Sequence, residues 1–196
     1  MRRARRRRPR SRLLLIVAAL ASIIVGYYAG QYWQRRPLEG LSVQVFDQGR
    51  PITYPEQFGI GFDNRHWRLF LAVDTRQPAC RELLRHFALV VNRLAAWPKV
   101  QARLRLTLLA YDQPGSNAIA AFTGGVNWVD VVTADAGSLD AVTQQLDIQP
   151  HGTIWCSEGT AGGVLVAPKH RAWARIPMEP AAVMARNIAG VVGFVE

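Results

Sequence analysis

The chain has 196 residues and a formal net charge of +10 at neutral pH, but the charge is unevenly distributed. Eight arginines lie between Arg2 and Arg12. Two more, Arg35 and Arg36, follow an apolar run, so ten of the 24 basic residues precede Pro37 and 14 remain against 14 acidic ones. Nucleic-acid binding needs basic side chains clustered on the folded part of a protein, so this distribution excludes it.

Residues 13–34 form a stretch of 22 residues without a charged side chain. At about 1.5 Å per residue, a helix of that length spans the roughly 30 Å hydrocarbon core of a bilayer. Tyrosines and a tryptophan gather at its end, as at a membrane edge. We therefore predict a transmembrane helix at 13–34, a basic head at 1–12, a linker at 35–40 and one globular domain at 41–196.

A cleaved signal peptide is the competing interpretation of the N-terminal segment, because a basic stretch before an apolar core is common to both. We favour an uncleaved signal anchor, because the apolar run is longer than the core of a usual signal peptide. The more basic flank stays in the cytoplasm. We therefore expect a single-pass protein of the bacterial inner membrane, with residues 41–196 in the periplasm.

The first elements of the domain are a predicted hairpin, a strand and a helix. Residues 41–46 and 51–53 flank the turn residues Asp47-Gln48-Gly49, which is typical of a hairpin. The nearly continuous apolar run 67–73 predicts a strand that is buried on both faces. From Cys80 to Leu94, apolar residues recur at steps of three and four, which predicts an amphipathic helix.

The remaining elements continue the alternation of strands and helices. Ser138 is the expected N-cap of a helix that runs to about Leu146, and Pro180 is expected to begin a closing helix. Strands are predicted at 104–110, 129–132, 153–156, 163–167 and 171–175. This order predicts an α/β domain with a central mixed sheet flanked by helices, because right-handed crossovers place helices on both faces. Thioredoxin-like folds have this order.

Cys80 is the first candidate functional residue. In such a fold the loop that leaves the first central strand delivers this residue to the N-terminus of the following helix. Unpaired amide hydrogens and the helix dipole favour an anion there. A thiolate at this position is stabilised, and it is a better nucleophile or soft-metal ligand than an ordinary cysteine.

At this turn the chain resembles the Sco/SenC family, over most of residues 41–192. Its members are thioredoxin-like, membrane-tethered copper chaperones that help to assemble the dinuclear copper centre of cytochrome c oxidase. The family carries Cys-x-x-x-Cys in the turn, where this chain has Arg76-Gln-Pro-Ala-Cys80. Only the second cysteine is therefore present, and Arg76 would place a cation beside a bound metal.

The resemblance also implies a histidine shortly before a strand that ends in a proline turn. Residues 164–168 match that strand, and the usual spacing points back to Gly159. His151 can take the role if residues 157–162 are an insertion. The resemblance therefore implies copper as the possible cofactor, with Cys80 and His151 as ligands and Cys156 as a replacement for the missing thiol.

Three alternatives remain open for the two cysteines, which are 76 positions apart and not in a CxxC motif. Each can be a buried core residue, since free cysteines are often buried. They can form a redox pair in which Cys80 attacks and Cys156 resolves. They can also form a disulfide, which persists in the periplasm.

The leading functional hypothesis is a Sco-like accessory protein that assists maturation of, or copper delivery to, a respiratory oxidase. Its expected partners are the inner membrane, through residues 13–34, and an oxidase subunit or assembly factor. The alternatives are a thiol-disulfide oxidoreductase that uses Cys80 and Cys156, and a redox-inert module that only binds a partner. The sequence contains no Ser/His/Asp constellation, phosphate loop or zinc spacing, which disfavours a hydrolase or a nucleotide enzyme.

Overall fold

The computed structural model describes residues 9–35, 38, 40–55, 58, 65–148, 156 and 162–196. The chain divides into two compact units, residues 1–39 and 40–196. The first unit contains helix α1 (Pro9–Arg35), so the helix predicted over 13–34 is confirmed as a helix. None of the helices in the described part of the chain is long and apolar enough to cross a membrane.

The second unit is built on one six-stranded mixed sheet with the order β1-β6-β5-β2-β3-β4. Its elements are β1 (Gln44–Pro51), β2 (Trp67–Val73), α2 (Pro78–Arg93), the 3-10 turn η3 (Leu94–Ala96), α3 (Pro98–Arg103), β3 (Leu104–Ala110), α4 (Ser116–Thr123), β4 (Val129–Val132), α5 (Ala136–Leu146), β5 (Gly163–Ala167), β6 (Arg171–Ile176) and α6 (Ala181–Val195). Strands β2, β3 and β4 are parallel, whereas β5, β6 and β1 run antiparallel to their neighbours. The predicted central mixed sheet is confirmed.

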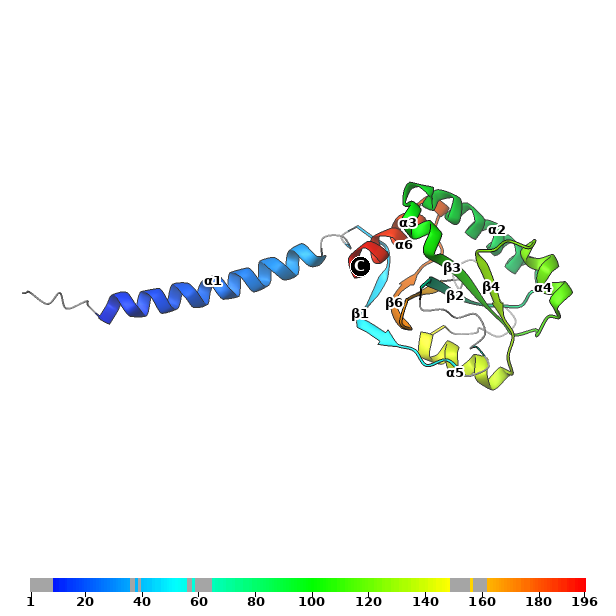
Figure 1. Ribbon diagram of the computed structural model, residues 1–196, viewed down its shortest axis with the longest axis horizontal. Helices are drawn as coiled ribbons and strands as arrows, with labels where there is room; N and C mark the ends of the chain where they lie inside the picture. Colours follow the sequence, from blue (N-terminus) through cyan, green and yellow to red (C-terminus); the bar gives the residue numbers. More distant parts are fainter. Residues whose placement is uncertain are drawn as a thin grey trace, which may run out of the picture. The chain divides into compact units, whose positions relative to one another are not determined.

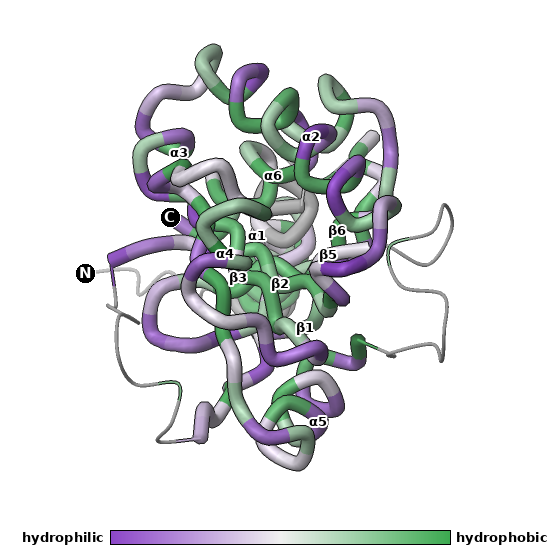
Figure 2. The backbone as a smooth tube through the Cα atoms, turned by 90° about the vertical axis from the view of Figure 1, so that its right-hand side faces the viewer, coloured by the Kyte–Doolittle hydropathy of each residue, from purple (hydrophilic) through white to green (hydrophobic). Residues whose placement is uncertain are grey.

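Helices cover both faces of this sheet. Helices α2, α3 and α6 lie on one side and α5 lies on the other, as both views show (Figures 1 and 2). The central strands are the most hydrophobic part of the tube in Figure 2, whereas hydrophilic residues concentrate on the outer helices and turns. This is the three-layer arrangement expected when each face of a sheet must be removed from water.

The core on the α5 side is a continuous apolar cluster around Phe70, which is completely buried. Leu139 and Val142 of α5 pack into it, together with Leu109 of β3 and Val164 of β5. On the opposite side, α2 buries Cys80, Leu83, Phe87 and Val90. Both faces of β2 are therefore occupied, which explains why its sequence is almost uninterruptedly apolar.

The hairpin predicted for residues 41–53 is wrong. Residues 44–51 form one strand, β1, which pairs with β6 and contains a large bulge between Val45 and Arg50. Gln48 and Gly49 have φ values of 59° and 62°, and this left-handed pair bulges the strand without reversing it. A Cβ on Gly49 would lie 2.8 Å from the Trp173 ring, so only glycine fits the close approach to β6.

The N-cap predicted at Ser138 is also wrong. Asp135 caps α5, because its carboxylate Oδ1 accepts a hydrogen bond of 2.9 Å from the backbone N–H of Ser138. Ser138 is thus the capped residue, three positions into the helical turn. Helices α3 and α4 and the turn η3 were not predicted, since they are short and carry no long apolar periodicity.

Gly163 provides a test of packing in the central sheet. A Cβ at this position would lie 2.7 Å from Cδ1 of Leu69 and 3.3 Å from the carbonyl oxygen of Phe70. We expect Gly163→Ala to lower the free energy of unfolding by about 1–3 kcal/mol, because the packed core must shift to accept it. Urea unfolding measures the change. In the matched control Gly193→Ala, the new Cβ meets nothing within 4 Å, so a loss of stability there would contradict the explanation.

Candidate thiol site

The candidate site lies where β2 ends and α2 begins. Parallel pairing aligns Val73 of β2 with Ala110 of β3, so the loops after the two strands emerge side by side. Pro78 occupies the first turn of α2, where its missing N–H loses no helical hydrogen bond. Cys80 is the third residue of the helix and is 1% exposed. The predicted placement of this cysteine at the start of a helix that follows a central strand is therefore confirmed.

Cys80 forms a disulfide with Cys156, and the two Cα atoms are 5.0 Å apart. This is one of the three alternatives that the sequence left open. The strand predicted over 153–156 falls mostly outside the described residues, but Cys156 itself is a bend residue with a φ of 61°, so its assignment to a strand is wrong. Unlike Cys80, Cys156 is partly exposed. The disulfide holds this second sulfur against the first turn of α2.

Arg76, which stands where the sequence resemblance implied a first cysteine, belongs to a network of charges in the loop. Its guanidinium donates two hydrogen bonds of 3.0 Å to the carboxylate of Asp74, and its Nε lies 3.8 Å from Oδ2 of Asp112. The side chain itself is three-quarters exposed. The cation at position 76 is thus paired with carboxylates of the same loop region.

Asp112 was not identified from the sequence, although it organises the loop. Its nearly buried carboxylate accepts hydrogen bonds from the backbone N–H of Thr75 at 3.1 Å and from the Thr75 hydroxyl at 2.6 Å. Thr75 and Asp112 each lie two positions after the end of a predicted strand, 67–73 and 104–110 respectively. Polar residues at the carboxyl ends of adjacent parallel strands were the signal that could have found them.

The hydrogen bonds from Arg76 lower the pKa of Asp74 below its ordinary value, against the opposing effect of burial. A carboxyl whose pKa is lower in the folded state stabilises the fold above its unfolded pKa, and this contribution is lost as pH falls through the folded pKa. We expect Arg76→Ala to raise the pKa of Asp74 and to reduce the loss of stability on acidification from neutral pH. NMR titration of the Asp74 carboxyl checks the shift.

Arg81→Ala is the matched control for this titration, because it removes another exposed cation near the start of α2 that makes no ion pair among the described contacts. The Asp74 titration should stay at its wild-type position in this variant. An equal shift in both variants would mean that net charge, and not the hydrogen bonds from Arg76, controls the pKa.

The predicted copper ligands are not assembled among the described residues. His151 lies outside the described part of the chain, and so does Gly159, the position to which the usual spacing points. In the described part, no three His, Cys, Asp or Glu side chains gather to hold a metal ion. His86 binds the backbone carbonyl of Glu179 through Nε2 at 2.9 Å, so it joins α2 to the residues before α6.

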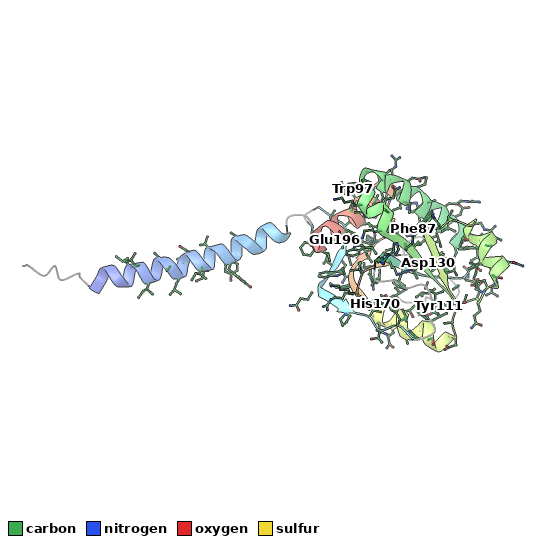
Figure 3. All side chains as sticks on the ribbon, viewed as in Figure 1. Phe87, Trp97, Tyr111, Asp130, His170 and Glu196 are labelled. Atoms are coloured by element: carbon green, nitrogen blue, oxygen red, sulfur yellow. A yellow bond between two sulfur atoms is a disulfide. The ribbon has the colours of Figure 1, made fainter. Side chains whose placement is uncertain are left out.

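A second polar cluster surrounds Arg68, which is 5% exposed. Its guanidinium donates to the Thr107 hydroxyl at 3.3 Å and to the Asp130 carboxylate at 2.5 Å, so it links the three parallel strands. Asp130 is labelled in Figure 3. Tyr54 and His170 lie beside Arg68 in a small pocket and their rings are 4.7 Å apart. Burial, reinforced by the charge of Arg68, lowers the pKa of His170.

Comparison with known proteins finds likeness at the level of structure alone. No family model matches the sequence, and no curated protein matches it. Apo Sco1 from Thermus thermophilus is 14% identical with a TM-score of 0.54, covering 78% of this chain and 96% of its own. Copper-bound ScoI from Arabidopsis thaliana is 11% identical with a TM-score of 0.53, covering 67% and 84%.

Yeast Sco1 is similar to the same degree, with 10% identity, a TM-score of 0.53 and coverage of 65% of this chain and 84% of its own. Identities this low establish the fold and nothing finer. Residues 40–196 therefore have a thioredoxin-like α/β fold that is structurally similar to Sco1 proteins, with the Cys80–Cys156 disulfide at the start of α2.

Proposed function

We propose that this chain is a Sco-like accessory protein that assists maturation of a respiratory cytochrome c oxidase, with Cys80 and Cys156 as its functional centre. The observation that carries the proposal is the position of Cys156. It is bonded to Cys80 of the strand-to-helix turn, where the family that the sequence resembles has both of its cysteines. The fold shared with Sco1 proteins supports the same assignment.

The chemistry of the pair depends on its redox state. As a disulfide, the two sulfurs offer no thiolate to a metal. Two-electron reduction yields two thiols on backbones that are 5.0 Å apart at Cα, and two neighbouring thiolates are soft ligands that suit Cu(I). Copper is then cargo of the reduced chain, and His151, five positions before Cys156, is the candidate third ligand.

Copper binding can be tested directly on the reduced full-length chain. We expect one Cu(I) to be retained against a chromogenic chelator, and Cys156→Ser to lose it. Adding Arg76→Cys to the Cys156→Ser variant restores a second thiol at the family's usual position and should restore retention. Absence of Cu(I) retention by the reduced wild-type chain would refute the copper role.

The cellular role is tested with a deletion strain grown at low copper. We expect oxidase activity and oxidase copper content to fall, and the wild-type chain or Leu89→Ala, which alters an exposed side chain of α2, to restore both. Cys80→Ser and Cys156→Ser should fail to restore them. A deletion strain with fully active, fully metallated oxidase would sink the proposal.

We further propose that α1 attaches the chain to the bacterial inner membrane, with the arginine-rich head in the cytoplasm and residues 41–196 in the periplasm. Support comes from the charge-free stretch 13–34 and from the large apolar side chains exposed along α1, which water solvates poorly. Resistance to carbonate extraction, with digestion of the domain by protease in spheroplasts, is the expected result. Recovery in the carbonate-soluble fraction would contradict attachment.

Thiol-disulfide exchange is the second candidate function, and the disulfide itself favours it. In this case the chain would oxidise or reduce cysteines of a partner without carrying copper. The deletion strain would then show an altered thiol state of that partner, and added copper would not rescue it. In copper delivery, by contrast, excess copper should restore oxidase activity.

A further inference from the structure

We propose that the two cysteines have unequal roles in exchange, with Cys156 as the sulfur that a partner thiol attacks and Cys80 as the leaving thiolate. The inference rests on the thiol-disulfide exchange proposed above and assigns a role in it to each sulfur. It reverses the assignment suggested by the sequence, in which Cys80 attacks and Cys156 resolves.

Access to the two sulfurs is the first argument. A thiolate attacks a disulfide in line with the S–S bond, from behind the sulfur that it captures, so the rate depends on which sulfur can be approached. Cys80 is 1% exposed and belongs to the buried face of α2, together with Leu83 and Phe87. Cys156 is partly exposed. An incoming thiol therefore meets Cys156.

Leaving-group stability is the second argument, and it is independent of access. Cys80 is the third residue of a 16-residue helix whose N-cap, Gln77, makes no side-chain capping bond, and the first turn contains no acidic side chain. Pro78 has no N–H and the N–H of Cys80 donates to the carbonyl of Gln77 at 3.1 Å, so it is the dipole of α2 that stabilises a thiolate on Cys80. Cys156 is itself a bend residue and not a helical one.

The acidic groups of the neighbouring loop are occupied by other partners. The carboxylate of Asp74 is bound by the guanidinium of Arg76, and the carboxylate of Asp112 accepts two hydrogen bonds from Thr75. Both carboxylates are therefore engaged in contacts within the loop. The N-terminal end of α2 is therefore the feature that stabilises negative charge on the Cys80 sulfur.

The exchange balances with a dithiol protein as the co-reactant. A thiolate of the partner forms a bond to the Cys156 sulfur, and the electron pair of the broken S–S bond passes to Cys80, which then takes up a proton. The second thiol of the partner, after losing its proton, attacks the partner's own sulfur in the mixed disulfide and releases Cys156 as a thiolate, which then takes up the second proton. Two electrons and two protons pass to this chain, and the partner leaves as a disulfide.

The test uses oxidised full-length chain in detergent with glutathione as the attacking thiol. After brief exposure, free thiols are blocked with N-ethylmaleimide and the chain is digested with trypsin. The sequence places the two cysteines in separate tryptic peptides, residues 77–81 and 106–169. We expect glutathione on the peptide with Cys156 and N-ethylmaleimide on the peptide with Cys80, in a ratio of at least about ten to one, because access and leaving group act in the same direction.

The same measurement in urea is the control, since unfolding exposes both sulfurs and removes the helix. The ratio should then approach one. A native ratio near one, or one that favours glutathione on Cys80, would overturn the inference.

Single-cysteine variants give a second readout that does not depend on the disulfide. Reduced Cys80→Ser retains the more exposed Cys156 and should react with glutathione disulfide faster than reduced Cys156→Ser, because the burial of Cys80 outweighs its larger thiolate fraction. The two variants should react equally in urea. Equal native rates would contradict the assignment. These outcomes can be distinguished from failure of the proposed function. If the deletion strain had a normal oxidase, the ratio of glutathione on Cys156 to glutathione on Cys80 would be unaffected. If that ratio were reversed, the two cysteines could still form a redox cycle.

Discussion

Reduction of the Cys80–Cys156 disulfide is expected to lower the free energy of unfolding by about 4.5 kcal/mol, as estimated from the chain-entropy model. The bond joins residues 76 positions apart, so it restricts a large part of the unfolded chain. Urea unfolding with and without a phosphine reductant, followed by tryptophan fluorescence, measures the difference. Because small domains are stable by only about 5–15 kcal/mol, this is a large fraction of the total.

The double variant Cys80→Ser, Cys156→Ser is the control for this experiment. It should unfold with the midpoint of the reduced wild-type chain and should not respond to the reductant. A change below about 1 kcal/mol on reduction of the wild-type chain would contradict the model, because it would mean that the unfolded chain gains little freedom when the bond opens.

This expected loss of stability bears on the proposed redox cycle. A pair that cycles must leave the domain folded in both states, so the reduced chain has to retain enough stability from its core alone. The side chains packed on both faces of β2 supply that core. The difference in unfolding free energy between the oxidised and reduced chain therefore also shows how much of the stability depends on the redox state of the candidate site.

The strands of the central sheet could be predicted from the sequence because burial on both faces leaves a distinct pattern. The bounds predicted for β2, β3, β4 and β5 agree with the structure. Continuous apolar runs of strand length, bounded by polar residues, have few other interpretations in a chain that alternates strands with helices. The order of these elements was enough to predict the fold class.

The error at β1 arose from turn chemistry that is locally ambiguous. Gln48 and Gly49 adopt left-handed conformations in a bulge as readily as in a hairpin turn. What decides between the two is Trp173 on the distant strand β6, whose ring lies against Gly49. A contact across more than 120 positions is not visible in the local sequence.

The candidate site was predicted only in part, because local sequence patterns do not show contacts between distant segments. The position of Cys80 follows from a local strand-to-helix pattern, and it was predicted. Its partner could not be chosen from the sequence, because pairing depends on where the chain returns Cys156 in space. The partial exposure of Cys156 likewise depends on the folded surface, so the unequal roles of the two sulfurs emerge only from the structure.

Phe70→Ala is expected to lower the free energy of unfolding by about 3–5 kcal/mol, the range found when a large aromatic core residue is truncated. Phe70 is completely buried on β2, and its ring stacks on that of Tyr54 at a centroid distance of 5.8 Å. It also packs with Leu109 and Leu139 in the core on the α5 side. Urea unfolding under oxidising conditions measures the loss.

Leu89→Ala is the matched control, because Leu89 is 56% exposed on α2 and its truncation should change stability by less than about 0.5 kcal/mol. Phe70 lies in the core opposite the α2 face, so Phe70→Ala should leave Cys80 and Cys156 bonded, and mass spectrometry of the unreduced chain checks this. A loss of less than about 1 kcal/mol for Phe70→Ala would mean that the α5-side core rearranges to fill the cavity. Loss of the disulfide would show instead that β2 transmits packing defects to the thiol site, so that core and redox centre are one cooperative unit.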